Sequence, residues 1–151
     1  MMTTVTVATT IEAPVERVFQ GFTDVEHFAE RVSNIQKVEE LTTGGFRLGT
    51  RWLETRDVLN QLDTVEMEVT AYERNRTYTI THHRAGARID AVFTFEPSGN
   101  GTKVRIEFGL ESHGLPPGLL APLGWAIAGK VRDVLSQDLA DLKRSMERRP
   151  A

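Results

Sequence analysis

The sequence contains no cysteine among its 151 residues. Disulfides, thiolate nucleophiles and cysteine-ligated metal sites are therefore excluded, and the redox compartment is left open. The chain also lacks a strong charge of either sign, because 18 basic and 21 acidic side chains give a formal net charge of −3. Without a broad basic field, nucleic acids and anionic lipid surfaces are poor partners for it, and we expect no nucleic-acid binding.

Long apolar runs are missing as well. The most apolar window, residues 115–131, contains three prolines and Lys130, whereas a membrane-spanning helix needs about 20 predominantly apolar residues. The N-terminus has no basic segment followed by an apolar run, so no signal peptide is visible and a cytoplasmic location is expected. With 40% apolar and 26% charged residues the composition is ordinary, and we expect one domain over residues 1–151.

Several motifs of catalytic and cofactor sites are also missing. Gly99-Asn100-Gly101 is a hairpin turn without the strand-to-helix context of a dinucleotide site. Neither a phosphate-loop lysine motif nor a Gly-x-Ser-x-Gly nucleophile elbow occurs. His82 and His83 are adjacent on an expected strand, so they point to opposite faces and cannot bind one metal together. We therefore expect neither a cofactor nor a metal.

The longest regular pattern is an apolar stripe near the C-terminus, between Pro116 and Arg148. Its residues recur at steps of three and four, which places them on one side of an α-helix. They are Leu120, Leu123, Ile127, Val131, Val134, Leu135, Leu139, Leu142 and Met146. A helix of roughly 25 to 30 residues spans on the order of 40 Å and must cross most of a small domain. Pro122 is expected to kink this helix or delay its start.

Acidic residues interrupt this helix near the stripe. Asp138 and Asp141 are followed by Lys143 and Arg144, so we interpret them as solvated ion pairs on the helix surface.

The rest of the chain reads as strands and two short helices. A strand is expected over residues 3–11, followed by helices that begin at Pro14 and, with capping-box spacing, at Thr23. Further strands are expected over residues 34–42, 50–59, 64–73, 77–83, 87–96 and 102–111. Ile35, Val38 and Leu41 do not share one parity, which predicts a bulge in the first of these. Because the turns between strands are short, we expect an antiparallel meander.

One face of this sheet is expected to be apolar. Val65, Met67 and Val69, for example, alternate with Glu66 and Glu68. The apolar face needs a partner, and the C-terminal helix offers the largest remaining apolar surface. We therefore predict an α+β fold in which a curved antiparallel sheet of about seven strands wraps around one long C-terminal helix, in the order β-α-α-β-β-β-β-β-β-α.

Five stretches spread along the chain carry a fold signature: Ile11–Phe19 (IEAPVERVF), Gly49–Arg56 (GTRWLETR), Val69–Glu73 (VTAYE), Phe93–Pro97 (FTFEP) and Gly101–Val104 (GTKV). Together with the element order, they resemble the START-like or polyketide cyclase/dehydrase superfamily, whose helix-grip fold is also that of the birch pollen allergen. The resemblance implies a cavity between sheet and helix. It implies no particular reaction, because the superfamily includes lipid and sterol carriers, aromatase/cyclases, hormone-binding proteins and co-chaperones.

Strand parity identifies the residues that face this cavity. If Met67, Ile80, Phe93 and Ile106 point inward, their neighbours at even spacing do so too. The expected lining residues are Trp52, Glu54, Arg56, Met67, Tyr78, Ile80, His82, Phe93, Ile106, Phe108, Leu123 and Ile127. The last two come from the first part of the long helix, which mixes bulky and very small residues and is expected to form a cavity wall and lid.

Glu54 and Arg56 are the most informative members of this set. A charge inside an apolar interior costs several kcal/mol unless it is paired or hydrated. An inward position therefore implies that the two side chains pair, line a water-filled cavity or orient a carbonyl or hydroxyl of a ligand. The alternatives are a purely structural ion pair, or a register shift that leaves both in solvent.

Two histidines and a tyrosine are further candidates. His82 is either a general acid or base for an enolisable substrate, since its ordinary pKa of about 6.5 suits proton transfer near neutrality, or a hydrogen-bonded cavity liner. Tyr78 either donates a hydrogen bond to a ligand or packs. His113 lies in the loop before the long helix, where the family resemblance places the cavity mouth, and either gates it or serves the loop alone.

Three functions are compatible with these features. The first is binding or transport of a small hydrophobic or aromatic molecule, such as a lipid, polyketide or isoprenoid, by a monomer or homodimer. The second is a polyketide cyclase or dehydratase in which His82, Glu54 and Arg56 act as acid/base and carbonyl-orienting groups. The third is a co-chaperone-like interaction module, which would need a filled cavity and an exposed apolar patch.

Overall fold

Alternating β-branched and polar residues build a seven-stranded antiparallel sheet with the strand order β1-β7-β6-β5-β4-β3-β2. The computed structural model describes residues 2–58, 60–84, 86–112 and 121–147. Its elements are β1 (Met2–Ile11), α1 (Val15–Phe22), η1 (Val25–His27), α2 (Phe28–Arg31), β2 (Ile35–Glu40), β3 (Arg51–Val58), β4 (Gln61–Glu73), β5 (Thr77–Arg84), β6 (Ala87–Ser98), β7 (Gly101–Ser112) and α3 (Ala121–Glu147). The element order and fold class predicted from the sequence are confirmed.

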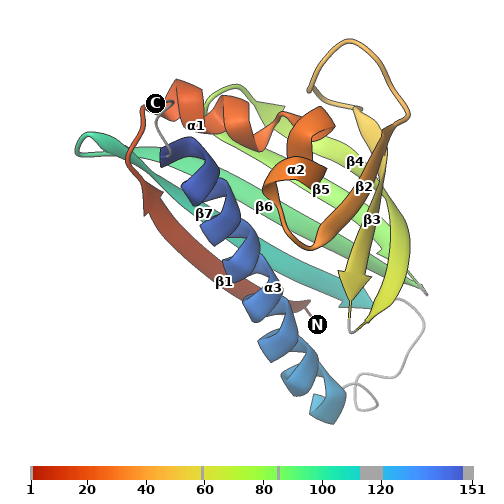
Figure 1. Ribbon diagram of the computed structural model, residues 1–151. Helices are drawn as coiled ribbons and strands as arrows, with labels where there is room; N and C mark the ends of the chain where they lie inside the picture. The colour runs from red at the N-terminus through yellow and green to blue at the C-terminus, as the bar shows by residue number, and fades with distance from the viewer. Residues whose placement is uncertain (1, 59, 85, 113–120, 148–151) are drawn as a thin grey trace.

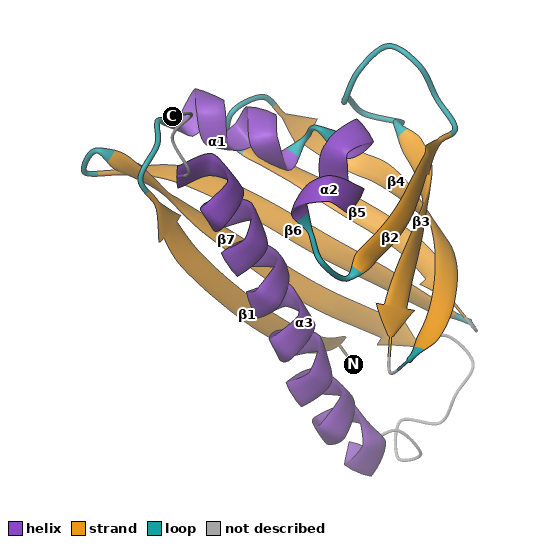
Figure 2. Ribbon diagram, in the orientation of Figure 1, coloured by secondary structure: helices purple, strands orange, loops and turns teal. Residues whose placement is uncertain are grey.

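All helices lie on one side of the curved sheet, and α3 runs diagonally across it (Figures 1 and 2). Two contacts attach the end of α3 to the end of β1. Lys143 Nζ donates a hydrogen bond to the carbonyl of Thr10 at 2.6 Å, and Glu147 Oε2 accepts the N–H of Glu12 at 2.9 Å. The helix is therefore fixed to an edge strand as well as to the core.

The stripe of α3 is buried over its second half. Leu135, Leu139, Leu142 and Met146 are each less than 10% exposed, as the spacing predicted. The helix begins at Ala121, so Pro122 lies in its first turn, where proline is tolerated. Residues 116–120 and 148 of the predicted helix lie outside the described residues. Among the described helices, none is both long and apolar enough to cross a membrane.

Two strands contain irregularities of register. The predicted bulge in β2 is confirmed, because pairing with β3 shifts between Ile35 and Lys37. A second shift, in β4, lies between Val69 and Ala71. Strand β4 also begins at Gln61, earlier than expected, since Asn60 adopts a φ of 63° and turns the chain directly out of β3.

The interpretation of Thr23 as a helix start is wrong. Its hydroxyl instead donates to the carbonyl of Phe19 at 2.9 Å, so Thr23 closes α1. The chain then makes a 3₁₀ turn from Val25 to His27 before α2 begins at Phe28. The hydroxyl shares the carbonyl of Phe19 with the backbone N–H of Thr23, which donates to it at 3.1 Å, so both groups of Thr23 cap the end of α1.

An aromatic cluster fills the core beneath α1. The ring of Phe19 meets those of Tyr72, Tyr78 and Phe95 edge-on, with centroids 5.1–5.9 Å apart. Phe22 contacts Phe95 in the same way at 5.3 Å. Such edge-to-face pairs contribute roughly 0.5–1.5 kcal/mol each beyond their buried area. The sheet is thus densely packed at this end, and the space farther along α3 is where a cavity lies.

Candidate ligand cavity

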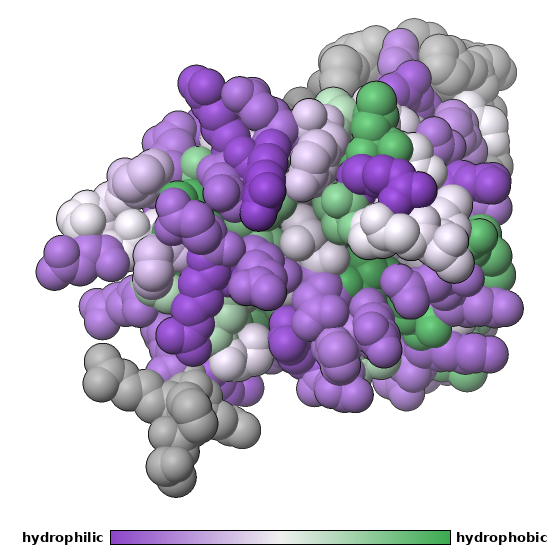
Figure 3. Space-filling view, turned by 90° about the horizontal axis from the view of Figure 1, so that it is seen from above, coloured by the Kyte–Doolittle hydropathy of each residue, from purple (hydrophilic) through white to green (hydrophobic). Residues whose placement is uncertain are grey.

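A cavity of about 890 Å³ lies between the concave face of the sheet and α3. Its walls are mainly apolar side chains from the middle strands and the helix. They include Phe28, Val65, Met67, Ile80, Ala91, Phe93, Ile106, Phe108, Val131, Val134 and Leu135. Mostly apolar clefts of roughly 300–1,000 Å³ are typical of small-molecule sites. On the face shown in Figure 3, hydrophilic side chains cover most of the surface and hydrophobic ones show between them.

The strand residues predicted to face inward line this cavity. They are Trp52, Glu54, Arg56, Met67, Tyr78, Ile80, His82, Phe93, Ile106 and Phe108. The side chains of Leu123 and Ile127 lie outside the described residues, as does His113. The parity argument therefore succeeds for the sheet, and the wall expected from the first turns of α3 stays a prediction.

Four of the side chains that line the cavity are connected by hydrogen bonds. The indole N–H of Trp52 donates to Glu54 Oε1 at 3.2 Å, and Arg56 Nε donates to Glu54 Oε2 at 2.7 Å. The two terminal nitrogens of Arg56 then donate to the two carboxylate oxygens of Asp138 at 3.2 and 2.9 Å. We call Glu54, Arg56 and Asp138 the ion cluster. It joins β3 to the middle of α3 through a bidentate bond.

The interpretation of Asp138 and Asp141 as solvated is wrong. Both residues are buried, with exposed fractions of 7% and 6%. Asp138 lies on the apolar stripe between Leu135 and Leu142, where Arg56 supplies its partner from the sheet. Asp141 does lie 3.8 Å from Arg144, as expected, but its stronger contacts are elsewhere.

Asp141 fixes α3 to the segment between α2 and β2. Its Oδ2 accepts the backbone N–H of Ser33 at 2.9 Å and the Ser33 hydroxyl at 2.8 Å, and its Oδ1 accepts the amide of Gln137 at 2.8 Å. Burial raises the pKa of Asp141, but these hydrogen bonds outweigh burial and hold the pKa below its ordinary value. The carboxylate is therefore a structural anchor in its charged form.

The ion cluster carries more negative than positive charge. Burial lowers the pKa of Arg56, but the charges of Glu54 and Asp138 outweigh it, so the pKa lies above its ordinary value. Burial raises the pKa of Asp138, and the bonds from Arg56 do not fully compensate because Glu54 lies nearby. One guanidinium shared by two carboxylates explains both directions. Arg56 stays charged, and the cluster keeps a net charge of −1 when both carboxylates are ionised.

Tyr78 lines the cavity but uses its hydroxyl within the fold. The hydroxyl donates to the carbonyl of Phe22 at 2.9 Å, and the ring stacks on Phe93 with centroids 4.6 Å apart. Burial, followed by the charge of Glu54, raises the pKa of the phenol well above its ordinary value. Tyr78 therefore ties β5 to the end of α1, which favours the packing alternative over donation to a ligand.

His82 is half-buried and lines the cavity from β5, while the adjacent His83 is exposed on the opposite face, as strand parity predicted. The imidazole of His82 thus shares the cavity with the ion cluster, which lies two strands away on β3 and on the helix. Adjacent strands are about 4.8 Å apart and the register puts His82 level with Trp52, so the backbones of His82 and Glu54 are separated by more than roughly 10 Å. A ligand of several rings would span that separation.

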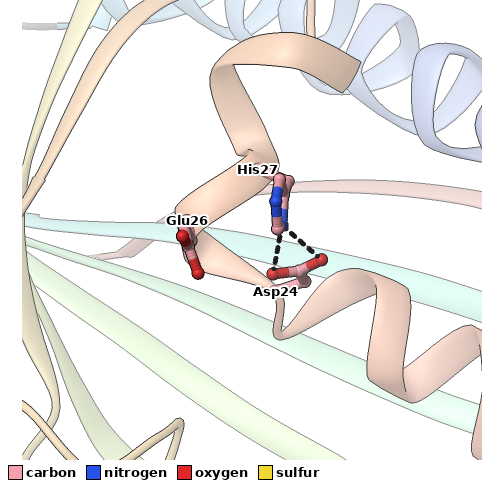
Figure 4. Close-up of side chains that lie close together, drawn as sticks. All are labelled: Asp24, Glu26 and His27. Carbon is pink, nitrogen blue, oxygen red and sulfur yellow. Dashed lines mark hydrogen bonds and ion pairs between the residues drawn. The ribbon is translucent and has the colours of Figure 1, made fainter.

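A separate polar group lies outside the cavity, at the turn before α2. Ligand atoms of Asp24, Glu26 and His27 lie within 4.8 Å of one another. Asp24 accepts His27 Nδ1 at 2.9 Å (Figure 4) and pairs with Arg31 at 3.1 Å. These hydrogen bonds, with the charge of Asp24, raise the pKa of His27. The printed hydrogen bonds and ion pairs of this group join Asp24 to His27 and Arg31.

One family model matches almost the whole sequence. The family model described as "Polyketide cyclase / dehydrase and lipid transport" matches residues 2–147. Among curated proteins, none matches the sequence significantly.

Solved structures share the fold at low sequence identity. The Zhui aromatase/cyclase from Streptomyces sp. R1128 is 16% identical with a TM-score of 0.82, over 99% of this chain and 96% of that one. A START superfamily protein from Mycobacterium smegmatis is 13% identical with a TM-score of 0.76, over 95% and 97%. Ara h 8.0201 is 15% identical with a TM-score of 0.74, over 97% and 98%.

Proposed function

Because this chain belongs to the polyketide cyclase/dehydrase and lipid transport family, we propose that it binds a small hydrophobic or aromatic molecule between the sheet and α3. The observation that carries this proposal is the cavity of about 890 Å³, whose walls are mainly apolar and include the ion cluster. Apolar walls provide affinity through burial, at roughly 25 cal/mol per Å² of apolar surface, and a few polar groups fix orientation. The ligand class we propose is lipid-, polyketide- or isoprenoid-like.

Binding is favoured over catalysis by the state of the ion cluster. Both oxygens of Glu54 and three N–H groups of Arg56 are engaged in hydrogen bonds within the protein. A general acid or base must instead reach the proton that it transfers, within about 2.6–3.2 Å. The cluster is thus better suited to orienting a ligand than to moving protons.

A cyclase or dehydratase activity is the second candidate, and His82 is the residue that supports it. It contributes an imidazole to the same cavity as Arg56, whose guanidinium is able to polarise a carbonyl. A co-chaperone-like module fits less well, because it requires a filled interior.

Binding is tested by titration with the neutral, environment-sensitive dye Nile red. Ala91 lines the cavity, so Ala91→Phe fills it and is expected to weaken dye binding at least about tenfold, or roughly 1.4 kcal/mol. Val92→Phe, at the next position on the opposite face of β6, is the matched control and leaves binding unchanged. Equal affinities for the two variants would contradict binding in this cavity. Native mass spectrometry of the purified protein checks directly for a co-purified small molecule.

The enzymatic alternative has its own test. A poly-β-ketone chain is incubated with the protein, and product formation is compared in wild type and His82→Gln. Turnover that His82→Gln lowers about a hundredfold or more, with Nile red affinity retained, supports an acid/base role. Turnover by wild type and variant alike, or no turnover by either, eliminates that role.

A further inference from the structure

Among the described residues that line the cavity, acidic groups outnumber basic ones, and this excess points to the chemistry of the ligand. Among the described lining residues, the carboxylates are Glu54, Asp57, Asp63, Asp133 and Asp138. The permanent cations in that set are Arg56 and Lys130. The innermost part of this charge is the ion cluster, whose Glu54 and Asp138 side chains are only 5% and 10% exposed.

A third carboxylate lies on the same face of the sheet as Arg56, on the neighbouring strand. Asp63 of β4 is paired directly with Arg56 of β3 in the antiparallel register, so the two side chains share a face. Directly opposed residues have Cβ atoms about 4.5–5.5 Å apart. Asp63 also lines the cavity. The guanidinium is bonded to two carboxylates, and a third carboxylate lies on the same face of the sheet.

Three of the five N–H groups of Arg56 already donate to carboxylates, including the pair that would bind an anion with two parallel hydrogen bonds. Its Nε and both terminal nitrogens already donate to carboxylate oxygens, in the fork geometry that a guanidinium offers to a bound acid. Asp138 thus occupies the position that the carboxylate of a fatty acid would take. An incoming carboxylate that used the same two terminal nitrogens would have to displace Asp138 and leave that buried charge unpaired.

Acceptor capacity, in contrast, is left over. Two carboxylates offer about eight lone-pair positions, and the described hydrogen bonds to Glu54 and Asp138 use four of them. Remaining positions on buried carboxylates are strong acceptors for N–H and O–H groups, most of all for charged ones.

From these contacts we propose that the cavity selects an apolar molecule with a cationic or hydrogen-bond-donating end, and rejects one that ends in a carboxylate. The donor end lies at the ion cluster, and the apolar body lies along the wall of Met67, Phe93 and Ile106. This inference rests on the proposed function and adds the polarity of the ligand to it.

The test compares three ligands with the same apolar body. Dodecylamine, dodecanol and dodecanoate, each below its critical micelle concentration, displace Nile red from the wild-type protein at pH 7.5 and low salt. The expected order of affinity is amine, then alcohol, then acid, with about tenfold or more between amine and acid. Equal affinities, or an acid that binds more tightly than the amine, overturn the proposal.

Variants locate the selectivity at the cluster. Asp138→Asn removes one negative charge and frees Arg56, so the ratio of amine to acid affinity is expected to fall at least about fivefold. Asp63→Asn tests the same charge balance without breaking the bond between β3 and α3. The control Glu66→Gln, on the outer face of β4, leaves the ratio unchanged. A ratio that neither Asp138→Asn nor Asp63→Asn alters overturns the assignment to the cluster.

The two proposals fail in different ways. If Nile red and all three ligands fail to bind, the proposed function itself is wrong and this inference is lost with it. If the dye binds in the cavity and the order of the three ligands differs from that expected, only the inference is wrong. The wild-type comparison decides this, so it does not depend on the folding of any variant.

Discussion

At the scale of single residues, Arg56 compensates the negative charges of two buried carboxylates, those of Glu54 and Asp138. Its guanidinium is held between Glu54 at 2.7 Å and Asp138 at 2.9 Å. Breaking a buried pair by removing one partner typically costs 3–5 kcal/mol, because the other charge is left uncompensated.

We predict that Arg56→Met lowers the free energy of unfolding by about 3–5 kcal/mol at pH 7.5. Without Arg56, the pKa of Asp138, already raised by burial, rises further above its unfolded value. Such a group stabilises the fold below its unfolded pKa and loses that contribution as pH rises through the folded pKa. The penalty is therefore smaller at pH 4.5, as measured by urea denaturation followed by circular dichroism.

The matched control for that experiment is Arg51→Met on the same strand. Arg51 is exposed and lies 3.6 Å from Glu66, and surface pairs of this kind contribute about 0–1 kcal/mol. A pH-independent loss in Arg56→Met, no larger than in the control, would show that the ion cluster does not carry the charge balance.

Asp141 gives a second prediction, with the opposite pH dependence. Asp141→Ala removes three accepted hydrogen bonds and leaves the N–H of Ser33 without its partner, so we expect a loss of about 1–3 kcal/mol at pH 7. The folded pKa lies below its ordinary value of 3.8. Its contribution is therefore present above that value and is lost as pH falls through the folded pKa.

The difference between wild type and Asp141→Ala should accordingly shrink at acidic pH, which urea midpoints at pH 7 and pH 2.5 measure. Asp133→Ala, an exposed change on the same helix, serves as control and should alter stability little at either pH. A difference that is the same at both pH values would contradict an anchor that acts through its charge.

The sequence identified the strand residues of this site and missed the residue that the helix contributes. Strand alternation alone placed Glu54, Arg56 and His82 on the inner face, because period-two parity is decided locally. Asp138 was missed, since a charged residue followed by Lys143 and Arg144 reads as a solvent-facing position. The signal that could have revealed it was the demand of an inward Arg56 for a partner, together with the spacing of Asp138 from Leu135 and Leu142 on the stripe.

At the scale of elements, the strands were easier to predict than the residues at which strands and helices begin and end. Runs of β-branched and apolar residues between turns located all seven strands, whereas the true start of β4 depends on the φ of Asn60 and the end of α1 depends on a hydroxyl bond of Thr23. Neither feature leaves a periodic trace. Long-range contacts, such as that between Thr102 Oγ1 and the carbonyl of Ala13 at 2.8 Å, leave none either.

The turn between β6 and β7 yields a prediction at this scale. A Cβ atom at Gly101 would lie 2.6 Å from the carbonyl oxygen of Ile11, a backbone atom that cannot rotate away. We expect Gly101→Ala to lower stability by about 1–3 kcal/mol because the end of β1 must shift.

Gly129→Ala in α3 is the contrasting variant, since nothing lies within 4 Å of its Cβ position. There alanine should stabilise the helix by up to about 1 kcal/mol. Thermal unfolding monitored by circular dichroism compares the two, and a Gly101→Ala protein as stable as wild type would refute the close approach.

At the scale of the whole molecule, the cavity exists because side chains fill the space between the sheet and α3 unevenly. Rings beneath α1 occupy one end of the space enclosed by the sheet, while small and aliphatic residues such as Ala91 and Val131 face the other. The sequence pattern predicted that sheet and helix face each other. It did not predict how much volume would be left, because that depends on how all the side chains pack together.

A bound ligand should therefore slow amide hydrogen exchange both in the sheet and in α3. With dodecylamine bound, we expect slower amide hydrogen exchange in β3 to β5 and in residues 131–142 of α3 together. A ligand on the outer face of the sheet would protect the strands alone. Hydrogen-exchange mass spectrometry with and without the amine, and with Ala91→Phe as the control that blocks the cavity, distinguishes these cases.

The bond from the Trp52 indole to Glu54 has an optical consequence. Indole emission responds to charge and polarity close to the ring, and this ring is 1% exposed, touches the cavity and donates to a member of the ion cluster. The sequence contains two tryptophans, so Trp125→Phe leaves Trp52 as the single emitter. That variant would report occupancy and the charge of the cluster through its own emission spectrum, with no added dye.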